Sequence, residues 1–145
     1  MFLGTHTPKL DEKGRFFLPA RFREALAEGL VIAKGQERCL AIYTVGEFTE
    51  QARAATAGSA TLRDVRNFQR TFGAGASEEV PDKQGRVTIP GVLRAYAGLD
   101  KEIAVIGALS RVEVWDLAAW EAHQAVQDAE FSALDAAINP GTGGG

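Results

Sequence analysis

The stretch Asp82-Lys83-Gln84-Gly85-Arg86-Val87-Thr88-Ile89-Pro90 repeats an earlier one, Asp11-Glu12-Lys13-Gly14-Arg15-Phe16-Phe17-Leu18-Pro19, at a shift of 71 residues. The identical pairs are Asp11 and Asp82, Gly14 and Gly85, Arg15 and Arg86, Pro19 and Pro90, and Arg23 and Arg94. Average residue usage predicts about one identity in a window of about sixteen residues, the length that also includes Arg23 and Arg94. Five identities therefore indicate a repeated structural device.

The chemistry of each copy predicts a turn, a short strand and a helix. An Asp three residues before a Gly is typical of a turn, because Asp caps neighbouring amides and Gly accepts a positive φ. Asp11 and Gly14 therefore structure the first turn, and Asp82 and Gly85 structure the second. The β-branched and aromatic residues that follow predict a strand. The proline after that strand suits the first position of a helix.

Hydrophobic spacing and capping residues predict the remaining elements. We expect strands over residues 1–10, 30–33, 39–43, 76–81, 103–106 and 112–115. We expect helices over residues 20–28, 48–57, 61–72 and 90–97, and after Asp116 towards residue 138. Thr44 and Glu47 have the form of a capping box ahead of the second helix. In the second half, Trp115 and Trp120 stand 72 residues after Tyr43 and Phe48.

These elements predict an α+β fold made of two β-β-α-β-β-α repeats. The repeats cover about 1–57 and 73–138, are joined by the helix at about 61–72, and form one domain over 1–138. Each repeat alone leaves a half-core and unpaired strand edges, so we expect an interleaved barrel with pseudo-twofold symmetry. Its expected core contains Phe17, Leu18, Ile89, Val112 and Val114. The Gly-rich segment 139–145 is expected to be a disordered tail.

The charge distribution separates the repeated motif from the acidic part of the chain. The net charge is −3 and the pI is about 5.4, which by themselves argue against binding of nucleic acid. Residues 1–94, however, hold 14 Lys and Arg against 11 Asp and Glu, while residues 95–145 hold 2 against 8. The single Cys39 makes no intrachain disulfide, and no signal peptide or membrane-spanning run is expected. These features favour a cytoplasmic protein.

Few residues suggest catalysis or binding of a metal or cofactor. His6, His123 and Cys39 lack the spacing of metal ligands, and no nucleophile or dinucleotide motif is present. We therefore expect no cofactor, no metal, no small-molecule substrate and no enzyme activity. The best enzymatic alternative is a carboxylate dyad of Asp11 and Asp82, as in an aspartic protease. A turn-capping role explains both residues more simply, because each stands four positions from an Arg.

Arg15, Arg86, Lys13 and Lys83 are the candidate DNA-binding residues. Arginine matches phosphate and the guanine edge, and the neighbouring Gly lets a partner approach the backbone. The alternative is that all four are solvated turn residues, and the residues alone leave both interpretations open. Arg23 and Arg94 are expected to pair with acidic neighbours or to brace the turns. The helix face of Arg63, Arg66 and Arg70 is expected to be solvated, with phosphate or a neighbouring subunit as further possibilities.

At these residues the sequence resembles the MraZ family of bacterial regulators, which belongs to the AbrB-like swapped-hairpin proteins. The resemblance rests on the opening Met1-Phe2-Leu3-Gly4, on both Asp-x-[Lys/Gln]-Gly-Arg turns, and on Pro19-Ala20-Arg21-Phe22-Arg23 and Leu93-Arg94-Ala95-Tyr96-Ala97-Gly98. It covers the chain to about residue 138. It implies a pseudo-twofold swapped-hairpin, or double-split, β-barrel with flanking helices.

The resemblance also implies a function. It implies a sequence-specific transcriptional regulator, usually a repressor, of the division and cell-wall gene cluster that includes its own gene. Such a protein binds direct repeats of double-stranded promoter DNA through Arg15 and Arg86, as a nucleoid-associated ring of about eight to twelve subunits. The alternative is a non-enzymatic oligomeric scaffold whose arginine turns bind an acidic protein.

Overall fold

The computed structural model describes residues 1–57 and 61–138. The first half contains β1 (Thr5–His6), β2 (Arg15–Phe17), α1 (Ala20–Leu26), β3 (Leu30–Lys34), the 3-10 turn η1 (Gln36–Arg38), β4 (Leu40–Tyr43) and α2 (Val45–Thr56). The second half contains α3 (Leu62–Ala74), β5 (Ser77–Glu79), β6 (Arg86–Thr88), α4 (Gly91–Tyr96), β7 (Ile103–Gly107), β8 (Val112–Asp116) and α5 (Leu117–Ile138). The predicted tail at 139–145 lies outside the described residues.

The two halves exchange strands within one antiparallel sheet. The strand order is β1-β7-β8-β4-β3-β5. Thus β1 of the first half pairs with β7 of the second, while β5 of the second half pairs with β3 of the first. The central pair, β4 and β8, joins corresponding strands of both halves. Neither half therefore completes this sheet alone.

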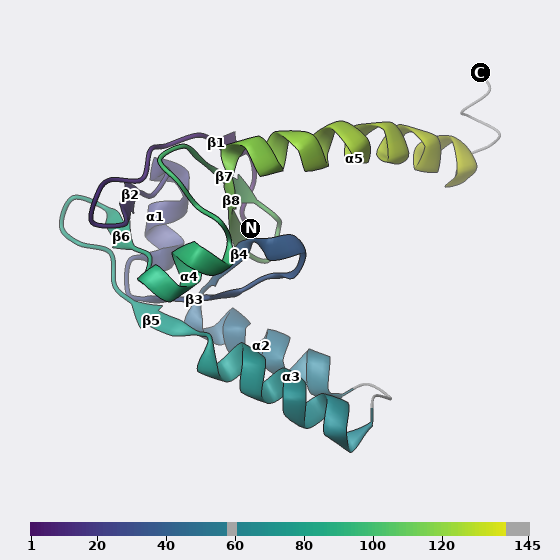
Figure 1. Ribbon diagram of the computed structural model, residues 1–145, viewed down its shortest axis with the longest axis horizontal. Helices are drawn as coiled ribbons and strands as arrows, with labels where there is room; N and C mark the ends of the chain where they lie inside the picture. Colours follow the sequence, from purple (N-terminus) through teal and green to yellow (C-terminus); the bar gives the residue numbers. More distant parts are fainter. Residues whose placement is uncertain (58–60, 139–145) are drawn as a thin grey trace.

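The α+β class is confirmed, whereas a closed barrel is not. The six-stranded sheet is open, with β1 and β5 at its edges. Strands β2 and β6 form a separate two-stranded ribbon. Figure 1 shows this ribbon at one end of the molecule, while α5 and the far ends of α2 and α3 project on the other side. The fold thus separates the repeated turns from the free helix ends.

Three local predictions were wrong. Pro19 and Pro90 are N-caps instead of first helical residues, because their extended backbones (ψ 136° and 147°) carry the chain out of the preceding strand. Their carbonyls accept the first bonds of the helices that follow. The helix expected over 20–28 ends at Leu26. The strand expected over 1–10 is interrupted, since Gly4 has a φ of +98° and Pro8 lacks an amide proton. Continuous pairing is limited to β1, and isolated bridges join Phe2 to Leu109 and Lys9 to Glu102.

The main core contains four of the five expected residues. Leu18, Ile89, Val112 and Val114 are buried in one cluster, but Phe17 is 51% exposed. The prediction for Phe17 was wrong because successive side chains of a strand point to opposite faces, and Phe16 takes the inward position. Burial of an aromatic side chain of this kind stabilises the fold by about 2–3 kcal/mol. The inner face of the ribbon therefore packs into the core through Phe16.

The predicted caps Thr44 and Asp116 are confirmed, but the reciprocal bond of a capping box is not observed among the described residues, where Glu47 Oε1 accepts from Gln51 Nε2 at 3.0 Å. Thr44 accepts a hydrogen bond from the Glu47 amide at 3.1 Å at the start of α2, and Asp116 accepts one from the Ala119 amide at 3.2 Å in α5. Helices α2 and α3 lie side by side beneath the sheet (Figure 1). Helix α5 starts against β7 and β8 and then extends away from the sheet (Figure 1).

Candidate nucleic-acid interface

The first turn is organised by the Asp11 carboxylate. Its Oδ1 accepts hydrogen bonds from the backbone amides of Lys13 at 2.9 Å and Arg15 at 2.8 Å. The Asp11 carbonyl also accepts from the Gly14 amide at 3.0 Å. Gly14 has a φ of +78°, a conformation that L side chains rarely adopt. The predicted roles of Asp11 and Gly14 in shaping the turn therefore match the geometry.

The second turn repeats the first almost atom for atom. The Asp82 Oδ1 accepts from the amides of Gln84 at 2.9 Å and Arg86 at 2.8 Å, and the Asp82 carbonyl accepts from the Gly85 amide at 2.9 Å. The φ of Gly85 is +83°. The repeat seen in the sequence is therefore a repeat of hydrogen-bond geometry.

Each aspartate also holds the arginine of its own turn. The Nε atoms of Arg15 and Arg86 donate to Oδ2 of Asp11 and Asp82 at 2.8 and 2.7 Å. Within the described residues, neither guanidinium makes a further hydrogen bond, so the Nη atoms are left for a partner. Hydrogen bonds from the arginine amides, the largest cause, and from the guanidinium groups lower the pKa of both carboxyl groups. Both aspartates are therefore ionised near neutral pH.

The ribbon of β2 and β6 brings the two turns together. Its register opposes Arg15 to Thr88, Phe16 to Val87 and Phe17 to Arg86. At its ends, the Leu18 amide donates to the Gly85 carbonyl at 2.9 Å and the Ile89 amide donates to the Gly14 carbonyl at 2.8 Å. The glycine of each turn is thus bonded to the strand of the other copy. The two arginine turns form one paired surface, which we call the turn pair.

Arg23 links the first repeat to the second turn. Its Nε donates to the Leu18 carbonyl at 2.9 Å. A Cβ at position 85 would lie only 2.8 Å from the same Nε, so the guanidinium packs directly on the glycine of the opposite turn. Arg23 forms no ion pair among the described residues. Of the two predicted roles, the brace is confirmed and the acidic partner is not observed.

Arg94 makes the symmetric contact from the second repeat. Its Nε donates to the Ile89 carbonyl at 3.0 Å, and a Cβ at position 14 would lie 2.7 Å from that Nε. The sequence placed Arg23 and Arg94 in equivalent slots but did not show that each braces the turn of the other copy. The sequence alone did not reveal the strand exchange, and this exchange determines which turn each arginine contacts.

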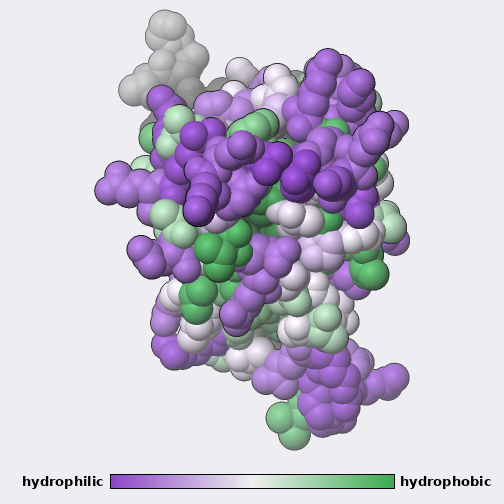
Figure 2. Space-filling model, turned by 90° about the vertical axis from the view of Figure 1, so that its left-hand side faces the viewer, coloured by the Kyte–Doolittle hydropathy of each residue, from purple (hydrophilic) through white to green (hydrophobic). Residues whose placement is uncertain are grey.

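The predicted lysines lie on the solvent side of the turn pair. Lys13 and Lys83 are exposed, and neither forms an ion pair within the described part of the chain. Figure 2 views the end of the molecule that carries β2 and β6, and its surface is mostly hydrophilic with a smaller hydrophobic patch. The turn pair therefore combines two arginines oriented by carboxylates with two exposed lysines that form no ion pair within the described residues.

The geometry does not favour a carboxylate dyad. In such a dyad one carboxyl group is protonated and shares its proton, whereas Asp11 and Asp82 are each bonded to an arginine and have lowered pKa values. The Cys39 thiol is buried, and burial raises its pKa to about 12. Within residues 1–57 and 61–138, no three His, Cys, Asp or Glu side chains are placed to hold a metal ion. Nor does that part of the chain contain a helix long and apolar enough to cross a membrane.

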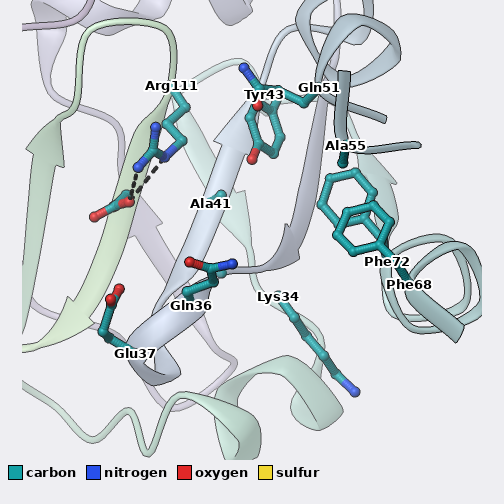
Figure 3. A pocket seen from close by; sticks show the side chains of 12 residues that line it. Lys34, Gln36, Glu37, Ala41, Tyr43, Gln51, Ala55, Phe68, Phe72 and Arg111 are labelled. Atoms are coloured by element: carbon teal, nitrogen blue, oxygen red, sulfur yellow. Dashed lines mark hydrogen bonds and ion pairs between the residues drawn. The ribbon is translucent and has the colours of Figure 1, made fainter. Parts of the chain in front are cut away.

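A half-open hollow lies away from the turn pair, between the sheet and the α2–α3 pair. Figure 3 shows Tyr43 and Arg111 on one side of it and the stacked rings of Phe68 and Phe72 on the other. Arg111 makes an ion pair with Glu113 at 2.8 Å, and this carboxylate also accepts from the Trp115 ring at 3.0 Å. Within the hollow, the charges of Arg111 and Glu113 therefore satisfy each other.

The described chain is thus a two-repeat α+β protein that presents a pair of arginine turns at one end. A family model described as "MraZ protein, putative antitoxin-like" matches residues 1–71 and again residues 72–138. The chain belongs to the MraZ family, as its resemblance predicts.

Similar proteins in other bacteria carry the name "Transcriptional regulator MraZ". The protein of Cutibacterium acnes is 59% identical over 132 residues, which cover 91% of this chain and 93% of the relative. The protein of Micrococcus luteus is 55% identical over 144 residues, covering 97% and 99%. That of Salinispora tropica is 54% identical over 141 residues, again covering 97% and 99%. The likeness therefore extends over nearly the whole chain.

Proposed function

We propose that this protein is a sequence-specific DNA-binding transcriptional regulator. It acts as a repressor of the division and cell-wall gene cluster that includes its own gene, and it binds direct repeats in the promoter. Residues 1–138 form one domain of two repeats, which assembles into a ring and works at the nucleoid in the cytoplasm. The names of the similar proteins support the regulatory role, and no cofactor, membrane or small-molecule substrate enters the proposal.

The observation that carries this proposal is the geometry of the turn pair. Arg15 and Arg86 are oriented by carboxylates through Nε alone, at 2.8 and 2.7 Å. An arginine held in this way directs its Nη atoms outward in a fixed plane, which suits a bidentate contact with a guanine edge or a phosphate. Because the same arrangement occurs twice, one subunit offers two such contacts.

Affinity in this proposal comes from the unpaired cations and from assembly. Lys13 and Lys83 suit contacts with phosphate, and each phosphate neutralised adds about 0.9 to the slope of log affinity against log salt. One turn pair binds weakly, but a ring places several pairs along a row of DNA repeats at high effective concentration.

The test is a mobility-shift titration with a promoter fragment from upstream of the protein's own gene, across a salt series. The double variant Arg15→Lys with Arg86→Lys keeps the charge but loses the planar guanidinium, so we expect specific affinity to fall about ten- to a hundredfold. Binding to unrelated DNA should change little. Arg53→Lys on α2 is the matched control, because Arg53 is an exposed arginine in an ion pair with Glu50. Unchanged specific affinity in the double variant contradicts the proposed role of the turns.

In the scaffold alternative, the same arginine turns bind an acidic protein instead of DNA. It predicts that the wild-type protein protects no promoter sequence, even at low salt, while it still binds an acidic protein through the same arginines. Footprinting of the upstream fragment therefore separates the two functions. A reporter driven by that promoter then tests repression, since loss of the turn arginines should raise its expression.

A further inference from the structure

The Tyr43 hydroxyl is a polar group that no part of the described chain satisfies. The chain has two tyrosines, and the Tyr96 hydroxyl donates to the Gly35 carbonyl at 2.6 Å. Tyr43 is only 7% exposed, yet its hydroxyl makes no hydrogen bond within residues 1–57 and 61–138. Figure 3 shows this hydroxyl pointing into the half-open hollow that Ala41 and Arg111 also line. Because a buried hydroxyl without a partner is unfavourable, it indicates a place for a ligand atom.

The second repeat shows what the first one lacks at this point. Trp115 stands 72 residues after Tyr43, and its ring nitrogen donates to Glu113 Oε1 at 3.0 Å. The residue 72 positions before Glu113 is Ala41, whose side chain offers Tyr43 no acceptor. In the sheet, Ala41 and Glu113 lie opposite each other on β4 and β8. The alanine thus leaves an unpaired hydroxyl and open space where the second repeat has a carboxylate.

The hollow has the size and the mixed lining of a small-molecule site. Its volume is about 290 Å³, at the lower end of the range for ligand pockets. Its apolar side includes Phe68 and Phe72, whose stacked rings have centroids 5.1 Å apart. Phe72 also contacts the Tyr43 ring edge-on, with centroids 6.2 Å apart. Aromatic side chains in this arrangement favour a flat aromatic ligand.

The charged groups of the hollow balance, which favours an uncharged ligand. The lining contains two cations, Lys34 and Arg111, and two acids, Glu37 and Glu113. Arg111 Nε donates to Glu113 Oε2 at 3.0 Å, and its Nη2 lies 2.8 Å from the same oxygen. The Lys34 ammonium lies over the Tyr96 ring, 5.3 Å from its centroid. A carboxylate in the hollow would meet repulsion from the acids as well as attraction to the cations, whereas a neutral carbonyl avoids this repulsion.

The polar wall of the hollow is held in place by the chain itself. The Gly35 amide donates to the Cys39 carbonyl at 2.8 Å, and the Gly35 carbonyl accepts from Tyr96 of α4. These bonds enclose η1, in which Glu37 and Arg38 have φ values of 58° and 60°. Strained residues of this kind cluster at ligand sites, where the surrounding structure holds them. A wall that is already ordered loses less freedom when a ligand binds.

We propose that this hollow binds a small, uncharged aromatic molecule that carries a carbonyl or amide oxygen. The aromatic ring lies against Phe68 and Phe72, and the oxygen accepts a hydrogen bond from the Tyr43 hydroxyl. Aromatic amides and heterocycles with a ring carbonyl share this chemistry. The inference does not rest on the proposed function, because the hollow shares no residue with the turn pair.

The test is saturation-transfer difference NMR on the full chain, with benzamide as the probe. This method detects the small molecule, so it also works when the protein is assembled. A fitting molecule of this size should bind with a Kd on the order of 1 mM. Three matched molecules each change one property. Benzoate adds a charge, cyclohexanecarboxamide removes the aromatic ring and fluorobenzene removes the oxygen, and each should bind about tenfold more weakly.

Two variants locate the binding. Tyr43→Phe removes only the hydroxyl, so the affinity for benzamide should fall about tenfold while that for fluorobenzene stays the same. Ala55→Leu adds bulk to an exposed position of α2 that lines the hollow, and it should abolish the binding of benzamide. The matched control is Ala54→Leu, at an exposed neighbouring position outside the lining, which should bind like the wild type. Circular dichroism and thermal melting check that each variant is folded.

Several results overturn the proposal. One is the absence of saturation transfer to benzamide at about 10 mM, and another is benzamide binding that Ala55→Leu leaves intact. Stronger binding of benzoate than of benzamide shows an anion site and contradicts the choice of an uncharged ligand. Equal binding of benzamide and fluorobenzene, unchanged in Tyr43→Phe, shows that the hydroxyl recognises no ligand. Because no DNA is present, none of these results bears on the proposed contacts of Arg15 and Arg86.

Discussion

Substitution of Gly14 tests directly whether each repeat stabilises the turn of the other. Its φ of +78° lies in the left-handed region, and a Cβ there would lie 2.7 Å from Arg94 Nε and 3.0 Å from the Ile89 carbonyl oxygen. The substitution Gly14→Ala therefore meets two separate obstacles. One is the backbone conformation, and the other is the arginine that braces the turn from the opposite repeat.

The two effects have separate magnitudes. A left-handed conformation costs an L-residue about 1–2 kcal/mol. Displacement of Arg94 loses its hydrogen bond to the Ile89 carbonyl, which costs about 1 kcal/mol more. We therefore expect Gly14→Ala to lower the free energy of unfolding by about 2–3 kcal/mol. The control is Gly46→Ala in α2, where an added Cβ meets nothing within 4 Å and helix propensity favours alanine.

Denaturant unfolding of four chains separates the two effects in a double-mutant cycle. The chains are wild type, Gly14→Ala, Arg94→Ala and the double variant. In the double variant the steric obstacle is gone but the left-handed φ remains. The double variant should therefore be about 1 kcal/mol more stable than the sum of the single losses predicts. The equivalent cycle with Gly85 and Arg23 should give the same coupling, since the Cβ at position 85 lies 2.8 Å from Arg23 Nε.

Two results refute this argument. If the losses add to within about 0.3–0.5 kcal/mol, Arg94 does not press on Gly14 in solution and the brace between the repeats is wrong. If Gly14→Ala is as stable as Gly46→Ala, the turn does not require its glycine. The affinity for promoter DNA, measured on the same chains, then shows whether turn geometry and binding change together.

Two further predictions concern the turn carboxylates and a helix cap. Because Asp11 and Asp82 have lowered folded-state pKa values, the stability they give is present above their unfolded pKa near 4 and is lost as pH falls through the folded values. Asp11→Asn with Asp82→Asn should therefore flatten the pH dependence of unfolding below about pH 4, measured by denaturation at stepped pH, and an unchanged profile contradicts the ion pairs. Thr44→Ala removes the 3.1 Å bond to the Glu47 amide and should cost about 1 kcal/mol in denaturant unfolding, while Thr44→Ser should recover most of the loss.

Much of the fold was predictable because its signals are local. The Asp-Gly spacing fixes each turn, and the strands and helices follow from periodicity and from caps such as Thr44 and Asp116. The errors are local as well. Phe17 was placed in the core because the segment is uniformly apolar, and only the pleat decides that Phe16 takes the inner side.

The relations between the repeats were less accessible to sequence reasoning. The repeat predicted that two halves complete each other, but the pairing of β1 with β7 and of β3 with β5 depends on long-range contacts. For the same reason the sequence did not show that Arg23 packs on Gly85 and Arg94 on Gly14. It identified the members of the turn pair but not their mutual support.

The ion pairs of the turns also bear on how an acidic chain can bind DNA in the proposed way. Since Asp11 and Asp82 each neutralise an arginine, Arg15 and Arg86 add little net charge to the turn pair. Their contribution to binding then lies in orientation, which favours discrimination between bases over general attraction to phosphate. The general attraction to phosphate then comes from unpaired cations such as Lys13 and Lys83. Because these cations are few, a single subunit should bind DNA weakly. In the proposed function, specific binding would therefore depend on several turn pairs acting together, so the proposed affinity for promoter DNA should fall when the protein is diluted to single subunits.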